Sequence, residues 1–284
     1  MAQSIHPFVL FFSPMKQALL ALTCLSALSL LACSTVQTTS SGAIGIERKQ
    51  YMMVSEEEVE KGAVESYQKE LAAAEKKKAL NIDEQQVTRV RTIANRLIPQ
   101  TTVFRPDAKN WKWEINVQKT DELNAYCMPG GKIMVYSGII EKLKLTDDEL
   151  AAIVGHEIAH ALREHTRERV SRAYAEQLGL SVLAVVTGAG NEAMKMASTI
   201  TQVTFGLPHN REQETESDRM GLELMARAGY NPSAAVTLWQ KMKAQGGSRT
   251  PEFLSTHPDS NNRISDLQAN LPKVMPLYEA AIKN

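Results

Sequence analysis

Residues 156–160 read His-Glu-Ile-Ala-His, the pattern H-E-x-x-H, and this stretch decides how the rest of the chain is interpreted. On a helix, positions four residues apart lie on one face, so His156 and His160 can point at a single ion. Tetrahedral Zn²⁺ accepts neutral imidazole nitrogens as ligands. Glu157 can then serve as the general base for a water activated by the metal. The pentapeptide alone is short enough to occur by chance, and the alternative is a pair of histidines satisfied by hydrogen bonds.

The residues around the pentapeptide predict a buried helix. Thr146 and Glu149 match a capping box, which marks a helix start. Apolar residues then recur with helical period at Leu150, Ile153, Val154, Ile158 and Leu162. Burying two histidines and a glutamate in such a helix is costly unless a metal engages them, which favours the metal site. His165 follows in a charged stretch and is predicted to be a solvated residue of the helix face.

A catalytic zinc of this type takes three protein ligands and leaves a fourth position open. Residues 211–218 read R-E-Q-E-T-E-S-D and open a second predicted helix, on which Glu214 and Asp218 share a face while Glu212 and Glu216 fall on another. We therefore expect Glu214 to bind the metal and Asp218 to accept the free imidazole N–H of a ligating histidine. The alternative is a solvated acidic helix face.

Together these motifs resemble the gluzincin zinc metallopeptidases, the family of the heat-shock protease HtpX and the CAAX prenyl endopeptidase. Within that family they are most similar to the bacterial periplasmic lipoprotein proteases LoiP and BepA. Two further stretches carry the resemblance, N-A-Y-C-M-P-G-G-K-I-M-V-Y-S-G at 124–138 and the T-H-P and R-I pairs within 256–264. The resemblance covers roughly residues 82–271. It implies an α+β, mostly helical metallopeptidase domain with a small β-sheet packed against the H-E-x-x-H helix, and one Zn²⁺ per chain.

The resemblance also implies roles for two other segments. The strand Ile133, Met134, Val135 and Tyr136 would border the cleft and pair with an extended substrate at its edge; the alternative is an ordinary sheet strand. His257 would be a regulatory fourth ligand or a hydrogen-bond donor to the transition state, although a His-Pro pair in a loop is more often structural. His209 is a competing imidazole to which we assign no role.

Residues 1–32 are predicted to be a secretory signal peptide, because a charged start at Met15-Lys16 precedes a short apolar core and a small residue before the cleavage site. Residues 1–14 contain no Lys or Arg, so Met15 is an alternative start. Residues 30–33, L-L-A-C, resemble a bacterial lipobox, which implies lipid on Cys33; Ser34 implies sorting to the outer membrane. An uncleaved membrane anchor is the alternative. Residues 33–54 are predicted to be a flexible tether, and residues 55–284 a single zinc metallopeptidase domain.

Composition narrows the function further. The formal net charge is zero and the sequence has no Lys/Arg stripe with interleaved aromatic residues, which argues against nucleic acid as a partner. Of the three cysteines, Cys24 is lost with the signal and Cys33 carries lipid, so Cys127 has no intramolecular disulfide partner. We expect Cys127 to be a small buried hydrophobe.

The sequence therefore predicts a zinc metalloendopeptidase, lipid-anchored on the periplasmic side of the outer membrane of a Gram-negative bacterium. Its expected substrates are unfolded, misfolded or misassembled envelope proteins, and its expected membrane contact is the lipid on Cys33. The alternative from another class of protein is a zinc-stabilised chaperone or assembly factor whose peptidase activity is suppressed (latched) by His257. A zinc aminopeptidase ranks lowest because no acidic motif for a substrate amine is visible.

Overall fold

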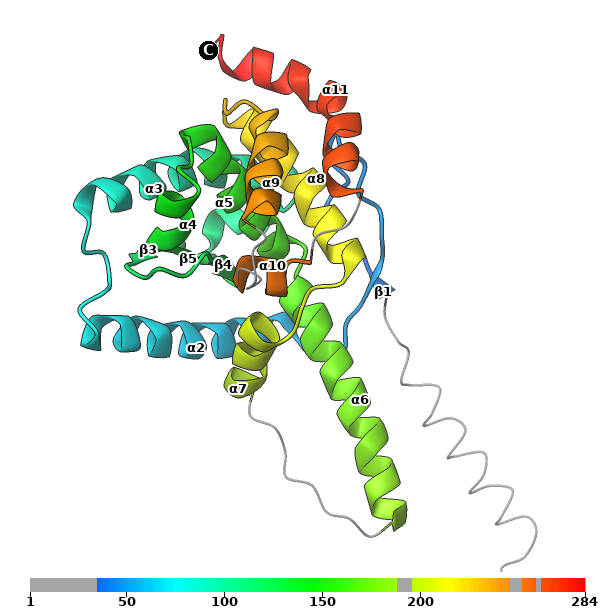
Figure 1. The fold of residues 1–284 in the computed structure, drawn as a ribbon. Coiled ribbons are helices and arrows are strands. Elements are labelled where there is room, and N and C mark those ends of the chain that lie inside the picture. The colour runs from blue at the N-terminus through cyan, green and yellow to red at the C-terminus, as the bar shows by residue number, and fades with distance from the viewer. Residues whose placement is uncertain (1–34, 188–195, 246–251, 259–261, 284) are drawn as a thin grey trace, which may run out of the picture. The chain divides into compact units, whose positions relative to one another are not determined.

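The predicted H-E-x-x-H helix is α5, Asp147–Leu162, and it lies in the middle of the fold (Figure 1). This computed structural model describes residues 35–187, 196–245, 252–258 and 262–283, which belong to one unit beginning at Thr35. The predicted signal peptide at residues 1–32 and the predicted lipid site Cys33 lie outside the described residues. Among the helices that are described, none combines the length and apolarity needed to cross a membrane.

The predicted capping box starts α5. The Thr146 hydroxyl accepts a hydrogen bond from the backbone N–H of Glu149, and the Glu149 carboxylate accepts one from the backbone N–H of Thr146. Every residue from Glu149 to Leu162 is buried. The polar groups of the H-E-x-x-H motif therefore lie in the interior, where they must satisfy one another or a ligand.

A small mixed sheet packs beside α5. Its strands are β3, Glu114–Gln118, β5, Lys132–Tyr136, and β4, Ala125–Met128, in the order β3-β5-β4. β5 runs parallel to β3, with Val117 opposite Val135, and antiparallel to β4, with Cys127 opposite Ile133. The turn between β4 and β5 needs glycine, because Gly130 and Gly131 have φ of 76° and 79°.

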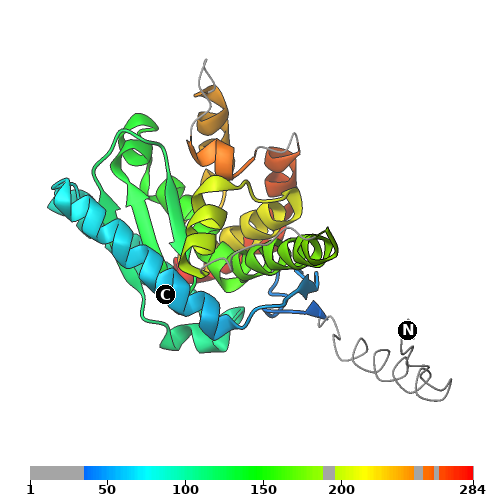
Figure 2. The ribbon, with the colours of Figure 1, turned by 90° about the horizontal axis from the view of Figure 1, so that it is seen from below.

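The two faces of this sheet are covered by different helices, as the alternation of side chains along a strand requires. Ala125, Cys127, Ile133 and Val135 join the core cluster of α5 and α3, Glu84–Leu97. The residues between them pack with α2, Glu56–Lys76, which crosses the sheet in Figure 2. Tyr67 of α2 donates its hydroxyl to the Ile133 carbonyl at 2.7 Å. The expected α+β, mostly helical fold with a small sheet against the H-E-x-x-H helix is confirmed.

The remaining elements surround this centre. They are β1 Thr35–Val36, β2 Gln50–Tyr51, η1 Ile98–Val103, η2 Pro106–Asn110, α4 Ser137–Lys142, α6 His165–Thr187, α7 Met196–Thr201, the π-helical η3 Gln202–Gly206, α8 Arg211–Arg227, α9 Ala234–Ala244, α10 Glu252–Thr256 and α11 Arg263–Ala281.

The prediction of a flexible tether at residues 33–54 is wrong for the described part of that segment. Residues 35–54, called here the N-terminal strap, close into a two-stranded antiparallel pairing of β1 with β2. Four apolar side chains of the strap are buried: Ile44, Ile46, Met52 and Val54. The Ser-, Thr- and Gln-rich start suggested a solvated linker, but the apolar residues that follow it bury enough surface to order the segment.

The prediction that Ile133–Tyr136 offers an edge to substrate is also wrong. β5 is the central strand, and its backbone groups pair with β3 on one side and β4 on the other. β4 is an edge strand, since no other described strand pairs with its outer side. The edge of the sheet next to α5 is therefore β4 and not the predicted Ile133–Tyr136 strand.

The helices α5 and α8 cross in close backbone contact. Gly155 of α5 faces Gly221 of α8, and a Cβ added at Gly221 would lie 2.8 Å from the backbone nitrogen of His156. Two glycines let the helix backbones approach more closely than larger residues would. The predicted metal-binding residues of the two helices are brought together by this contact.

We expect Gly221→Ala to destabilise the fold by about 1–3 kcal/mol, because the added methyl meets backbone atoms that can yield only if the helices separate. The measurement is denaturant unfolding followed by circular dichroism. Gly206→Ala is the matched control, since its added Cβ would have only a side-chain atom at 3.6 Å. An equal loss of stability in both variants would contradict the close-crossing interpretation.

Candidate metal centre

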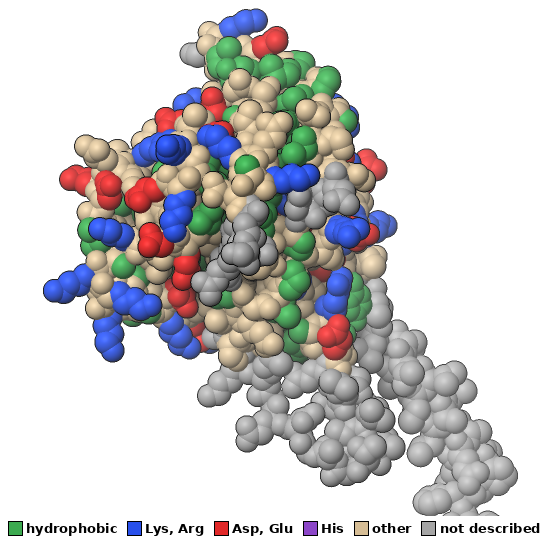
Figure 3. All heavy atoms as spheres, viewed as in Figure 1, with side chains coloured by type: hydrophobic (Ala, Val, Ile, Leu, Met, Phe, Trp, Pro, Cys, Tyr) green, Lys and Arg blue, Asp and Glu red, His purple; other side chains and the backbone are tan. Residues whose placement is uncertain are grey.

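The histidines of the motifs are interior residues. The face shown in Figure 3 has acidic and basic side chains interspersed, and no histidine is visible among its described residues. His156, His160, His165 and His257 are all buried. Burial holds the pKa of His156 and of His160 well below the usual value, so both rings are neutral, which is the form that binds metal.

Four side chains converge on one point. His156 and His160 of α5, Glu214 of α8 and His257 after α10 each direct one donor atom there, and these atoms all lie within 4.8 Å of one another. The two imidazole Nε2 atoms are 3.0 Å apart, and His160 Nε2 is 3.3 Å from Glu214 Oε1. The three predicted ligands are thus brought together.

The hydrogen bonds of His156 show which of its nitrogens is free. His156 Nδ1 is 2.9 Å from Asp218 Oδ1, and the same oxygen accepts from Arg263 at 2.7 Å. A carboxylate paired with arginine accepts hydrogen bonds, so His156 Nδ1 carries the proton and its Nε2 presents a bare lone pair to the centre. This is the place that the sequence predicted for Asp218.

The donor set fits zinc. Burial by itself would raise the pKa of Glu214, but His257 and Arg263 beside it lower that pKa well below the usual range. The centre therefore offers two neutral imidazoles and one ionised carboxylate, the His₂Glu set of a catalytic zinc site. Lone pairs of His156 and His160 that face each other at 3.0 Å would repel one another without a cation between them.

Glu157 lies beside this group. Burial raises the pKa of Glu157 to about 8. Its Oε1 atom is buried and makes no hydrogen bond to any described residue, and His257 Nε2 is 3.6 Å away. A buried carboxylate with a free oxygen and a pKa near neutrality is suited to taking and returning a proton.

His257 lies close both to the predicted zinc ligands and to Glu157. Its Nδ1 is 3.1 Å from Glu214 Oε1 and 3.3 Å from His156 Nε2, while its ring stacks on Phe253 and on His209. It therefore approaches the donor group from the side that faces Glu157. This position agrees with either of the two roles expected for it, a fourth ligand or a hydrogen-bond donor near the reacting carbonyl.

A pocket of about 370 Å³ opens onto the centre. Its floor includes Glu157, His160 and His257, and one wall is β4 with the preceding Asn124. The opposite wall comes from α6 and η3, including Arg169 and Phe205, with His209 after them. The edge strand β4 thus lines the same pocket as Glu157, His160 and His257. The predicted Ile133–Tyr136 strand, β5, is the next strand of the sheet.

Two residues at the centre were not foreseen. Arg263 was noted only within a motif, yet it is 2% exposed and pairs with Asp218 and Glu214. The prediction that His165 is solvated is wrong, because His165 is fully buried and its Nδ1 is 2.8 Å from His160 Nδ1. The reason is Glu164, whose φ of 51° breaks the helix, so that α6 starts at His165 in a new direction. A continuous helix would have placed His165 on another face.

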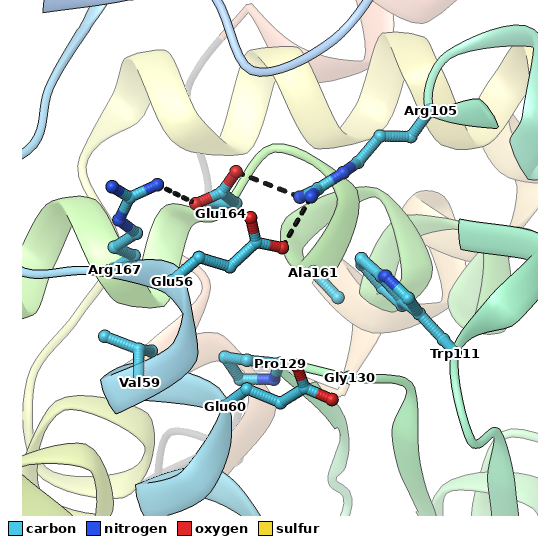
Figure 4. A pocket seen from close by; sticks show the side chains of 10 residues that line it. All are labelled: Glu56, Val59, Glu60, Arg105, Trp111, Pro129, Gly130, Ala161, Glu164 and Arg167. Carbon is cyan, nitrogen blue, oxygen red and sulfur yellow. Dashed lines mark hydrogen bonds and ion pairs between the residues drawn. The ribbon is translucent and has the colours of Figure 1, made fainter. Parts of the chain in front are cut away.

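A second pocket, shown in Figure 4, lies apart from these residues beside the Pro129–Gly130 turn. Four of its charged side chains, Glu56, Arg105, Glu164 and Arg167, form ion pairs with one another. Arg105 pairs with Glu56 at 2.5 Å and with Glu164 at 2.9 Å, and Arg167 reaches the other oxygen of Glu164 at 2.7 Å. This is an ion-pair network that joins α2 to α6.

The family of the chain follows from comparison with known proteins. Residues 84–271 match peptidase family M48, and the chain belongs to this family. The expected class, a zinc metallopeptidase of the gluzincin type, is confirmed. The four motifs identified in the sequence all fall inside or at the ends of the matched range, so the cofactor of the centre is zinc.

Curated relatives include a mitochondrial protease and two bacterial ones. The mitochondrial metalloendopeptidase OMA1 of Saccharomyces cerevisiae is 37% identical over 176 residues, which are 59% of this chain and 50% of that protein. The beta-barrel assembly-enhancing proteases of Yersinia pestis and Escherichia coli are each 28% identical, over 202 and 170 residues, covering 39% and 34% of those proteins. The chain thus spans half or less of the length of these relatives.

Removing zinc should lower the thermal stability of the protein, because the metal binds the folded donor set and not the unfolded chain. At zinc a thousandfold above its Kd, the stabilisation is about 4 kcal/mol. Differential scanning fluorimetry before and after dialysis against a chelator, with zinc added back, measures this. Glu214→Gln is the comparison variant and should show a much smaller zinc response. A chelator-insensitive Tm would exclude a zinc ion held by these residues.

Proposed function

We propose that the protein is a zinc-dependent endopeptidase of the bacterial cell envelope that degrades misfolded or misassembled proteins. The observation that carries the enzymatic part is the convergence of His156, His160 and Glu214 beside a buried Glu157 with a free oxygen. The family match and the metalloendopeptidase names of the relatives support the reaction class.

In peptide hydrolysis, the residues of the centre would have the following roles. His156, His160 and Glu214 hold zinc, and Asp218 orients His156. When bound, zinc would supply a Lewis acid able to lower the pKa of a water and to polarise a carbonyl. Glu157 takes the proton of the attacking water and returns it to the leaving amine.

Substrate binding is assigned to β4. Its outer edge has backbone groups that no described strand occupies, and it borders the pocket next to Glu157 and His160. An extended peptide adding to this edge would bind through main-chain hydrogen bonds, which read backbone more than side chains. Such binding suits substrates defined by being unfolded.

The envelope part of the proposal rests on other observations. Two relatives are beta-barrel assembly-enhancing proteases, and closed β-barrels are the membrane-spanning proteins of the bacterial outer membrane. The L-L-A-C stretch at residues 30–33 supports lipid attachment at Cys33 and export. The substrates would then be unfolded or misassembled envelope proteins, and the lipid would hold the enzyme to the outer membrane from the periplasmic side.

A second candidate is a zinc-stabilised chaperone or assembly factor that binds unfolded chains and cuts them slowly. The observation in its favour is His257, whose Nδ1 lies within 3.3 Å of two ligand atoms and whose Nε2 faces Glu157. In this position His257 would act as a latch on the centre, taking the place that water and the substrate carbonyl need.

Glu157→Gln should reduce cleavage of an unfolded protein such as casein by about 10²–10⁴-fold while zinc stays bound, because only the proton acceptor is lost. Proteolysis assays and metal analysis of the same preparation measure both effects. Glu212→Gln, at an exposed position on α8, is the matched control and should behave as wild type. Undiminished cleavage by Glu157→Gln would remove Glu157 from this role.

His257→Ala should separate the two roles of His257. If His257 latches the centre, the variant cleaves faster, and a tenfold increase corresponds to a latch of about 1.4 kcal/mol. If His257 donates to the transition state, the variant cleaves more slowly. Rates at saturating casein, with zinc content measured alongside, distinguish the outcomes, and an unchanged rate argues against both.

Cys33→Ala should release the protein from the membrane fraction of a Gram-negative host into its soluble periplasmic fraction, because the attached lipid supplies the membrane affinity. Immunoblots of fractionated cells measure the distribution, and Cys24→Ala serves as the control because Cys24 lies within the signal. The same membrane association in the Cys33 variant and the wild type would rule out lipid anchoring at this residue.

A further inference from the structure

His160 makes a second contact that leads away from the metal centre. Its Nδ1 is 2.8 Å from His165 Nδ1, and His165 Nε2 is 3.0 Å from Glu216 Oε2. His165 is 0% exposed and Glu216 is 7% exposed. A ligand histidine, a second histidine and a carboxylate thus form a buried chain, separate from the Asp218 contact of His156.

The positions of the protons in this hydrogen-bonded series follow from Glu216, its last member. The Glu216 carboxylate bonds two arginines and accepts hydrogen bonds, so His165 Nε2 is the donor to it. If His165 Nδ1 also carried a proton, it would donate to His160 and leave the proton of a neutral His160 on Nε2, which would block metal binding. His165 Nδ1 is therefore the acceptor, His160 Nδ1–H is the donor, and His160 Nε2 keeps the lone pair that a zinc ligand needs.

Glu216 is held in place by two arginines. Arg163 donates to Oε1 at 3.0 Å, and Arg48 donates Nε and one terminal nitrogen to the two oxygens, each at 2.9 Å. Arg48 belongs to the N-terminal strap and also binds both oxygens of Glu168. Glu216 is consequently held by Arg48 of the N-terminal strap, a segment that lies outside the range matching the peptidase family.

We propose that His165 and Glu216 are positioning residues for the zinc ligand His160, and that Arg48 of the N-terminal strap completes this support. Hydrogen bonding by a carboxylate through a second imidazole fixes the ring orientation of His160 and makes its Nε2 a better donor to metal. The inference rests on the proposed zinc centre, and it adds that the affinity for zinc depends on the strap.

The alternative is a purely structural role, in which Glu216 only stabilises the fold by binding the strap to α8. The chain offers a matched control for that reading. Glu223 is also a buried carboxylate of α8 that binds the strap, accepting the backbone N–H of Ile44 at 2.9 Å and pairing with Arg227. Among the described residues, Glu223 forms hydrogen bonds with Ile44 and Arg227 and none with a histidine. A purely structural role predicts that Glu216→Gln and Glu223→Gln affect zinc binding alike.

The test is the zinc Kd of the purified full chain, measured by competition with a chromophoric chelator, together with the Tm of each metal-free variant. We expect His165→Phe and Glu216→Gln to weaken zinc binding about 10–100-fold, as loss of such outer contacts typically does. Arg48→Met should weaken zinc binding less. Glu223→Gln should leave the zinc Kd within about threefold of wild type even where its Tm falls.

His165→Asn keeps an acceptor near Nδ1 but cannot bridge to Glu216, so its zinc Kd should lie between those of wild type and His165→Phe. The proposal is overturned if Glu216→Gln and Glu223→Gln shift the Kd equally, or if His165→Phe, or His165→Asn where the former does not fold, binds zinc as wild type does. If wild type itself binds no zinc, the proposed function fails instead. A wild type that binds zinc with insensitive variants removes only this inference.

Discussion

The close crossing of α5 and α8 is the contact on which the rest of the structure depends. Gly155 and Gly221 allow the two backbones to touch, and this contact holds His156, His160 and Glu214 with their donor atoms together. The same crossing aligns Asp218 with the outer nitrogen of His156. Helix periodicity places the groups on each face, and the missing side chains at the crossing bring the two faces within coordination range.

Burying so many charged groups in one place requires close pairing, since each unpaired charge in the interior would cost several kcal/mol. Arg263 offsets both Asp218 and Glu214, and Arg48 with Arg163 offsets Glu216. Glu157 is less closely paired, because its Oε1 has no hydrogen-bond partner among the described residues and lies 3.6 Å from His257 Nε2. This carboxylate is the one that the proposed reaction needs as a proton acceptor.

The N-terminal strap contacts the domain next to the metal centre. Its apolar residues bury against the domain, and Arg48, Gln50 and Thr39 reach the region where α5 ends and α6 begins. That junction is the break at Glu164, which turns His165 back toward His160. The domain that carries the zinc centre therefore begins well before residue 55.

The sequence by itself determined the local part of the site. The H-E-x-x-H spacing, the capping box at Thr146 and the shared face of Glu214 and Asp218 follow from local helix geometry. The structure has the capping box, brings His156, His160 and Glu214 together, and places Asp218 against His156. Tertiary structure decided the rest, because strand order, the break at Glu164 and the packing of the strap depend on contacts between distant residues. The sequence could identify Ile133–Tyr136 as a strand, but only the sheet shows that β4 is the edge strand. A charged neighbourhood made His165 look solvated, and only the fold buries it against His160.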